Sequence, residues 1–245
     1  MKKIYKLKDL VDKINKFRSN LVISDSEDIL CNIVSDCFKI PNIREYTSEL
    51  GMLYNDIKLN WAWYCIAKGK DVEKGINVIY NYVSNADRAM HLSNEFRKII
   101  LAQSVKASSV IAYIIGKIAR EDRDYTHEEL IITNALSKMT DFDLYNFIEL
   151  VQNHVVKMTG KDVIELSEID TDNMDSLYYT MQLCAANGIF VAESDLIGEN
   201  LDDEMLEDCD SVYGGIHYLK TKYCDVLLKY IEDVEQIIPC GKDML

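Results

Sequence analysis

Proline and glycine are scarce in this sequence, with 2 and 10 among its 245 residues. Both interrupt regular elements and fill tight turns, so their scarcity argues against a turn-rich β fold and favours long helices. Hydrophobic residues make up 48% of the chain, and a chain of this length buries a substantial core as one large domain or two small ones. We therefore expect a mainly α protein.

The sequence also lacks paired cysteines and an export signal. None of its 7 cysteines stands in a CxxC pair or at zinc-site spacing, and the N-terminal MKKIYKLKDL has no apolar run of the signal-peptide kind. An odd number of thiols without an export signal is typical of a reducing compartment, so we expect a cytoplasmic protein. Cys184 and Cys224 are the most deeply buried by pattern and are poor candidates for reactive thiols.

A long apolar run without charges is missing as well. The most apolar segment, residues 99–118, contains Gln103, Lys106 and Lys117 and is apolar on one side only. Small residues four apart also occur in transmembrane helix pairs. Charges at these depths nevertheless favour a buried helix of a soluble protein over a membrane span.

Lysine and arginine are absent from residues 162–219, which contain fifteen acidic residues. The rest of the chain has 26 acidic and 27 basic residues, so this segment accounts for the net charge of -14. Phosphates and anionic lipids are bound chiefly by Lys and Arg, so we expect neither nucleic acid nor a membrane as its ligand. The candidate partner-binding surface consists of the densest carboxylates, Asp202, Asp203, Glu204, Glu207, Asp208 and Asp210.

Helical periodicity is clearest between residues 96 and 143. An apolar stripe predicts one buried helix through Phe96, Ile100, Ala107, Ile111, Ile114, Ile115 and Ile118. Small residues every four positions predict the close approach of a second helix at Ser104, Ser108, Ala112 and Gly116. Residues 121–124 break the apolar pattern, and Thr126 with Glu129 forms a capping box that begins the next helix.

Other helices are predicted on both sides of this region. A basic amphipathic helix is predicted over residues 3–19 and is interpreted as docked on the core. A second helix, which is not basic, is predicted over residues 29–38. An aromatic helix over residues 45–68 is assigned to the core because no arginine lies among its aromatic side chains, and a helix over residues 72–83 follows. After residue 140 we predict a helix, an extended piece at 163–166, a helix at 172–186, a β segment at 189–191, an acidic loop, an extended piece at 213–219 and a helix at 221–238.

Two segments of this C-terminal part carry a family resemblance. The final wing strand and closing helix of winged-helix proteins resemble the segment IHYLKTKYCDVLLKYIEDV, residues 216–234. The place of the recognition helix, which leads into the first wing strand, is taken by DNMDSLYYTMQLCAANGIF, residues 172–190. With the helical N-terminal region, the layout is similar to uncharacterised bacterial and phage-associated proteins of the abortive-infection helical type. We expect a multi-helix bundle domain over residues 1–141 and a small α+β, winged-helix-like acidic domain over residues 142–245.

The segment that would read DNA in such a domain has no Lys or Arg, so we expect it to bind protein or dimerise. The predicted function is a non-enzymatic cytoplasmic interaction protein whose acidic region meets a basic surface of a protein partner. The resemblance implies an accessory role in bacterial mobile elements or phage conflict. The alternative is a DNA-binding transcription regulator that uses the C-terminal winged helix. Aromatic and small-residue faces also permit a homodimer.

Motifs for catalysis, cofactors and metals do not stand out. The 4 histidines have no HExxH spacing, and we interpret His127 as solvent-facing and His217 as a core or edge residue. The acidic residues 202–210 could collect a divalent cation, but without EF-hand spacing a solvated loop is preferred. EDRDYTHEEL, residues 121–130, looks like the acidic interhelical turn of TerB-type tellurite-resistance proteins but lacks its usual glycine, so no metal site is carried over. We expect no cofactor, and an enzyme is less favoured because no catalytic group is identified.

Overall fold

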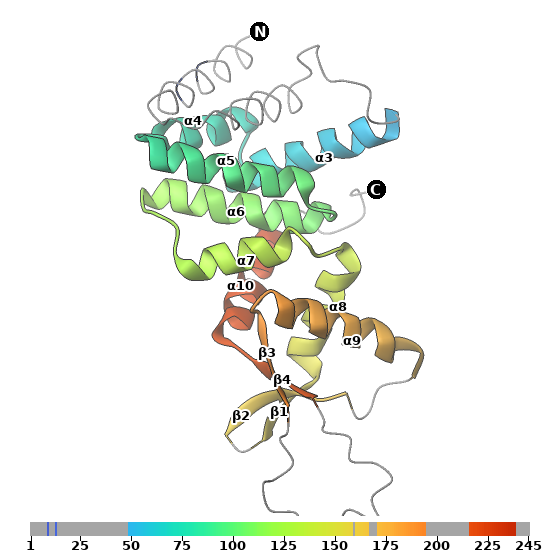
Figure 1. Ribbon diagram of the computed structural model, residues 1–245. Coiled ribbons are helices and arrows are strands. Elements are labelled where there is room, and N and C mark those ends of the chain that lie inside the picture. Colours follow the sequence, from blue (N-terminus) through green and yellow to red (C-terminus); the bar gives the residue numbers. More distant parts are fainter. Residues whose placement is uncertain are drawn as a thin grey trace, which may run out of the picture. The chain divides into compact units, whose positions relative to one another are not determined.

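The computed structural model describes residues 49–158, 160–166, 171–194 and 216–238, together with Asp9 and Lys13. Most of the predicted helix over residues 3–19, all of the one over residues 29–38 and the acidic loop lie outside this part. Within it the chain is mainly helical, with one small antiparallel sheet (Figure 1). The predicted mainly α character is therefore confirmed.

The described residues form two compact units. The first unit consists of the described residues within Met1–Asp141 and Leu227–Leu245. The second unit consists of the described residues within Phe142–Val226. The sequence predicted a division into 1–141 and 142–245, whereas the last helix, α10 (Lys222–Ile237), enters the first unit at Leu227. Its distal half joins that unit because Tyr230 donates to Glu129 over 3.2 Å and Asp233 accepts from Tyr113 over 3.0 Å.

Helix α6 is the centre of the first unit. The described helices of this unit, besides the distal part of α10, are α3 (Glu49–Ile66), α4 (Val72–Tyr82), α5 (Ala86–Leu101), α6 (Val105–Glu121) and α7 (His127–Leu136). Every α6 residue from Ala107 to Ala119 except Lys117 is buried, as expected of a helix that is covered on nearly all sides. None of the described helices is both long enough and apolar enough to cross a bilayer.

Two glycines allow helices of the first unit to come close together. A Cβ atom on Gly116 of α6 would lie 2.5 Å from the carbonyl oxygen of Ile66 at the end of α3. A Cβ on Gly75 of α4 would lie 2.8 Å from the carbonyl oxygen of Trp63. Because real Cβ atoms do not approach backbone this closely, both contacts require glycine. The close helix approach predicted at Gly116 is confirmed.

The single helix predicted from residue 96 to 118 is wrong. Helix α5 starts after its N-cap Asn85, and α6 begins after Ser104, whose Oγ accepts from the backbone N–H of Ala107 at 2.8 Å. The Nζ of buried Lys58 donates to carbonyls at the C-terminal end of α5, those of Ile100 at 2.6 Å and of the C-cap residue Ala102 at 3.0 Å. A cation at the C-terminus of a helix satisfies its free carbonyls, so this contact stabilises the break.

The second unit combines two helices with the sheet. Its elements are α8 (Asp141–Asn153), β1 (Val155–Met158), β2 (Lys161–Ile164), α9 (Thr171–Ala186), β3 (Phe190–Ser194) and β4 (Ile216–Lys220). The strands lie in the order β1-β2-β4-β3 and all neighbours are antiparallel. Strand β1 was not predicted, because its residues were assigned to the preceding helix and its turn. Helices α8 and α9 lie where the sequence predicted them, and the other strands overlap their predicted segments with shifted ends. Strand β2 lies two residues earlier than predicted, and β3 ends three residues later.

Candidate functional site

The six predicted partner-binding carboxylates, Asp202, Asp203, Glu204, Glu207, Asp208 and Asp210, lie outside the described residues. The division of the chain nevertheless sharpens the charge asymmetry. Residues 142–226 contain 18 acidic residues and 4 lysines, a formal charge of -14, while the rest of the chain has 23 acidic and 23 basic residues. The whole net charge therefore belongs to the second unit.

Lys161 and Lys220 of the second unit are paired with carboxylates. Lys161 Nζ contacts both carboxylate oxygens of Glu193 at 2.9 and 2.7 Å, which joins strands β2 and β3 across the sheet. Lys220 Nζ lies 2.6 Å from Asp225 Oδ1. These pairs are partly exposed and contribute little stability, but they reduce the positive charge available to an anionic ligand.

Helix α9 exposes aromatic side chains and carries no Lys or Arg. Leu177, Met181 and Cys184 face the core of the unit. On another side, Tyr178 packs edge-on against the buried Tyr218 of β4, with ring centroids 6.1 Å apart. Tyr179 points to solvent with 62% of its surface exposed. The surface of α9 therefore presents aromatic side chains and no cation.

Helices α8 and α9 cross through a set of polar contacts. Asn146 Nδ2 of α8 donates to Ser176 Oγ at 2.8 Å and to Thr180 Oγ1 at 3.0 Å. The Thr180 hydroxyl in turn donates to Oδ1 of buried Asp143 at 3.1 Å. Because the side chains at the crossing satisfy one another, the two helices are fixed at this point.

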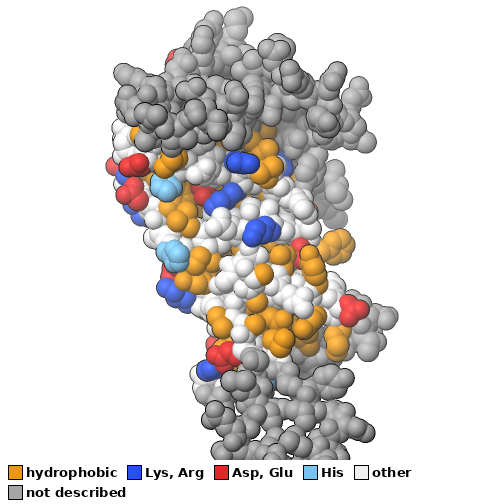
Figure 2. Space-filling model, viewed as in Figure 1, with side chains coloured by type: hydrophobic (Ala, Val, Ile, Leu, Met, Phe, Trp, Pro, Cys, Tyr) orange, Lys and Arg blue, Asp and Glu red, His pale blue; other side chains and the backbone are white. Residues whose placement is uncertain are grey.

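Two further aromatic side chains are exposed on α8. Phe142 and Tyr145 are 81% and 74% exposed, whereas Leu144, Phe147 and Leu150 on the other side of the helix are fully buried. In Figure 2 hydrophobic side chains gather on the surface over α8 and α9. The sequence signal was present, because both residues fall off the apolar stripe that predicts the core face. The stripe alone indicates the core face of the helix, so Phe142 and Tyr145 were not predicted as candidate contact residues.

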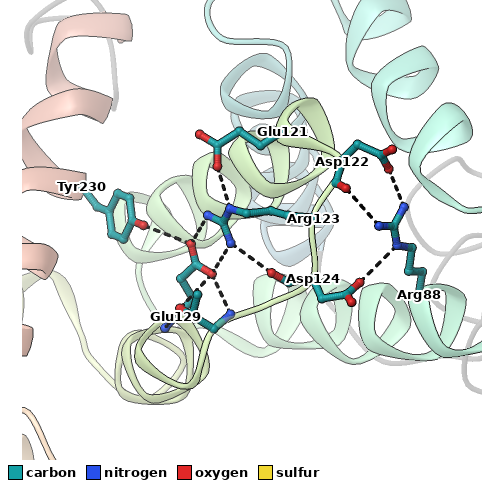
Figure 3. A network of polar contacts seen from close by, with 8 residues as sticks. Arg88, Glu121, Asp122, Arg123, Asp124, Glu129 and Tyr230 are labelled. Atoms are coloured by element: carbon teal, nitrogen blue, oxygen red, sulfur yellow. Dashed lines mark hydrogen bonds and ion pairs between the residues drawn. The ribbon is translucent and has the colours of Figure 1, made fainter.

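The charged turn between α6 and α7 contains a network of polar contacts (Figure 3). Glu129 Oε2 accepts from the backbone N–H of Thr126, which completes the predicted capping box, and Arg123 holds both Glu129 oxygens at 2.8 and 2.5 Å. Arg123 also contacts Glu121, and Tyr230 donates to Glu129. Burial raises the pKa of Glu129, but the bonds from Arg123 and Thr126 outweigh it and lower the pKa. Glu129 is thus an ionised anchor.

A second arginine closes the same turn. Arg88 Nη1 lies 2.5 Å from Asp122 Oδ1, and its Nε lies 3.2 Å from Asp124 Oδ1. Asp122 is the C-cap of α6 and has a left-handed backbone with φ +49°. Since Asp122 and Asp124 are highly exposed and already paired, this network holds the connection between helices and has the character of a structural clamp.

Glu95 of α5 is a buried carboxyl with an incomplete set of hydrogen bonds. Its Oε1 accepts from Lys98 Nζ at 2.6 Å, while Oε2 and the hydroxyl of Tyr125 make no hydrogen bond within the described part. Burial raises the pKa values of Glu95 and Tyr125. A raised pKa is common in acid–base catalysts, but this side chain is only 3% exposed, which keeps its proton away from a substrate.

The described thiols and histidines have no arrangement suited to catalysis. Burial raises the pKa of Cys65 to about 12 and that of Cys224 to about 11, and it raises the pKa of Cys184 well above the usual value. The predicted burial of Cys184 and Cys224 is confirmed. His127 is exposed, as predicted, and His217 is half-buried on β4. In the described ranges there is no group of three or more His, Cys, Asp or Glu that could hold a metal ion.

Fold and surfaces together define a two-unit, mainly helical protein with one strongly acidic unit that has exposed aromatic side chains on α8 and α9. No protein-family model, curated protein or solved structure matches the chain.

Proposed function

We propose that the protein is a non-enzymatic, cytoplasmic interaction protein whose acidic unit, residues 142–226, binds a basic surface of a protein partner. The observation that carries the proposal is the confinement of the entire -14 charge to this unit. A concentrated anionic surface attracts a cationic partner over long range, which raises the association rate and makes binding weaken as salt increases.

We also propose that the second unit is a winged-helix-like module. The antiparallel order β2-β4-β3 supports this, as does the position of α9 between β2 and β3. Thr221 leads from β4 into α10, and its hydroxyl donates to the carbonyl of Ile189 at 2.6 Å. The aromatic surface of α9 favours protein as the ligand of such a module. The accessory role in mobile elements or phage conflict stays a prediction.

A DNA-binding transcription regulator is the competing function. It would need phosphate contacts from Lys or Arg, and α9 has none. An electrophoretic mobility shift at low ionic strength tests it with mixed-sequence duplex DNA. Retention of the DNA by the protein would favour the regulator and count against our proposal.

Neutralising the acidic unit tests the interaction directly. We expect affinity purification from the native cells to recover a basic protein at low salt and to lose it at high salt. The variant Glu204→Gln with Glu207→Gln should recover less of that protein, and the variant neutralised at all six predicted carboxylates least. The control Asp87→Asn with Glu232→Gln removes two exposed carboxylates from the first unit and should recover as much as the wild type. Failure to recover any basic protein at low salt would refute the proposal.

A further inference from the structure

We propose that the crossing of α8 and α9 is where the partner docks, and that the docking element is an arginine-containing protein segment. The guanidinium groups of the partner would stack on the rings of Phe142, Tyr145 and Tyr179. Their positive charge would pair with the carboxylates of Asp175 and Glu149. This inference rests on the proposed function, because it specifies the surface and the partner chemistry of the same acidic unit.

The first support is geometric. On α8, Phe142 lies four residues before Asn146, and Tyr145 lies directly before it. On α9, Tyr179 lies three residues after Ser176. Asn146 and Ser176 are hydrogen-bonded at the crossing, so all three exposed rings lie within about one helical turn of it. The rings are 81%, 74% and 62% exposed, which is unusual for side chains of this size.

The second support is the position of carboxylates beside the rings. Asp175 lies one turn before Tyr179 and is exposed, and Glu149 lies one turn after Tyr145 with 46% of its side chain exposed. Glu149 also lies 3.5 Å from His154, a contact that leaves it partly open to solvent. Residues four apart share a helix face, so Tyr145 and Tyr179 each have an anionic neighbour. This pairing of aromatic and acidic groups suits a planar cation.

The charge of the unit selects the occupant. A second copy of the chain would bring another charge of -14 against this unit, which opposes self-association through the same face. A purely apolar partner would leave the carboxylates beside the rings unpaired. Arginine fits better than lysine because its guanidinium is planar, stacks on aromatic faces and holds a carboxylate with two donors.

Two synthetic peptides test the inference on the full chain. One alternates arginine with serine, and the other has the same length and charge with lysine at each arginine. Calorimetric titration at physiological ionic strength should give the arginine peptide about fivefold higher affinity. The variant Tyr145→Ser with Tyr179→Ser should bind it about tenfold more weakly and lose the preference. The matched variant Tyr145→Phe with Tyr179→Phe keeps both rings and should bind as the wild type does. Circular dichroism checks that all three proteins have the same helix content.

Each contrary result has a distinct meaning. The first contrary result is that both peptides bind with equal affinity, more weakly at higher salt, and equally well to the wild type and to the Tyr145→Ser with Tyr179→Ser variant. This result would overturn the inference and leave the proposed function intact. No binding of either peptide at low ionic strength would count against both. A concentration-dependent dimer in sedimentation, lost in the Tyr145→Ser with Tyr179→Ser variant, would assign the face to a second copy and overturn the inference.

Discussion

Glu95 and Glu129 are both buried glutamates of the first unit, yet their surroundings move their pKa values in opposite directions. Glu129 receives enough donors to overcome the cost of burial, and Glu95 does not. The sequence identified the capping box of Glu129 because Thr126 lies only three residues away. It could not identify Tyr230 as a partner, since that residue is 101 positions distant and only the fold brings it near.

We expect Glu129→Gln to lower the free energy of unfolding by about 2 kcal/mol at neutral pH, because Arg123 loses its buried ionised partner. The loss should be measured by chemical denaturation. Since the folded pKa is lowered, this stabilisation is present above the ordinary pKa of 4.5 and disappears as pH falls through the folded value. The control Glu121→Gln removes a more exposed contact to the same arginine and should cost less than about 1 kcal/mol. Equal losses for the two variants would contradict the clamp.

The opposite pH dependence is expected at Glu95. Its raised pKa means that the folded state prefers the protonated form, so its contribution is present below the ordinary pKa of 4.5 and is lost as pH rises through the folded value. The melting temperature of Glu95→Gln, relative to the wild type, should therefore increase as the pH is raised above 4.5. Thermal melts across that range measure it, and a difference independent of pH would exclude an effect of ionisation at this residue.

At the scale of elements, the packing of α3 on α6 depends on the missing side chain of Gly116. Gly116→Ala should destabilise the protein by about 2 kcal/mol or more, because the new Cβ meets the backbone of Ile66. Helix propensity acts in the other direction by only about 1 kcal/mol. The neighbouring change Lys117→Ala, at a half-buried position, should cost less, and thermal unfolding compares the two. A Gly116→Ala variant as stable as the wild type would show that the helices can separate freely.

Sequence periodicity found most of these elements and failed at two identifiable places. The break before Ser104 was missed because the apolar positions of α5 and α6 happen to continue at helical spacing across it. The carbonyls at that break are satisfied by Lys58, whose contribution is tertiary and leaves no local pattern. Strand β1 was missed because four residues are too few for alternation to outweigh the preceding helix.

At the scale of the whole molecule, a chain ending at Asp141 should be less stable than one joined by a flexible linker to residues 227–245. The distal part of α10 buries Leu227, Tyr230, Ile231 and Val234, and their burial is worth about 4 kcal/mol or more. Thermal unfolding of the two shortened proteins compares their stabilities. Equal melting temperatures would mean that α10 is dispensable to the first unit.

The sequence anticipated the acidic character of residues 162–219 because charge composition needs no three-dimensional information. It missed the return of α10 to the first unit, since amphipathic spacing shows that a helix has a partner but not which one. The exposed rings of Phe142 and Tyr145 were missed for a related reason. A residue off the core stripe becomes a candidate contact only when its exposure is known.

The return of α10 also affects how the protein is made. A ribosome releases residues 142–226 before it releases the distal half of α10, so the first unit cannot be completed while the second is being synthesised. Domains usually fold in order from the N-terminus. Here the first unit is incomplete until α10 has been synthesised. Until translation has passed Tyr230 and Asp233, Glu129 and Tyr113 lack the hydrogen bonds that these two residues make with them in the folded protein.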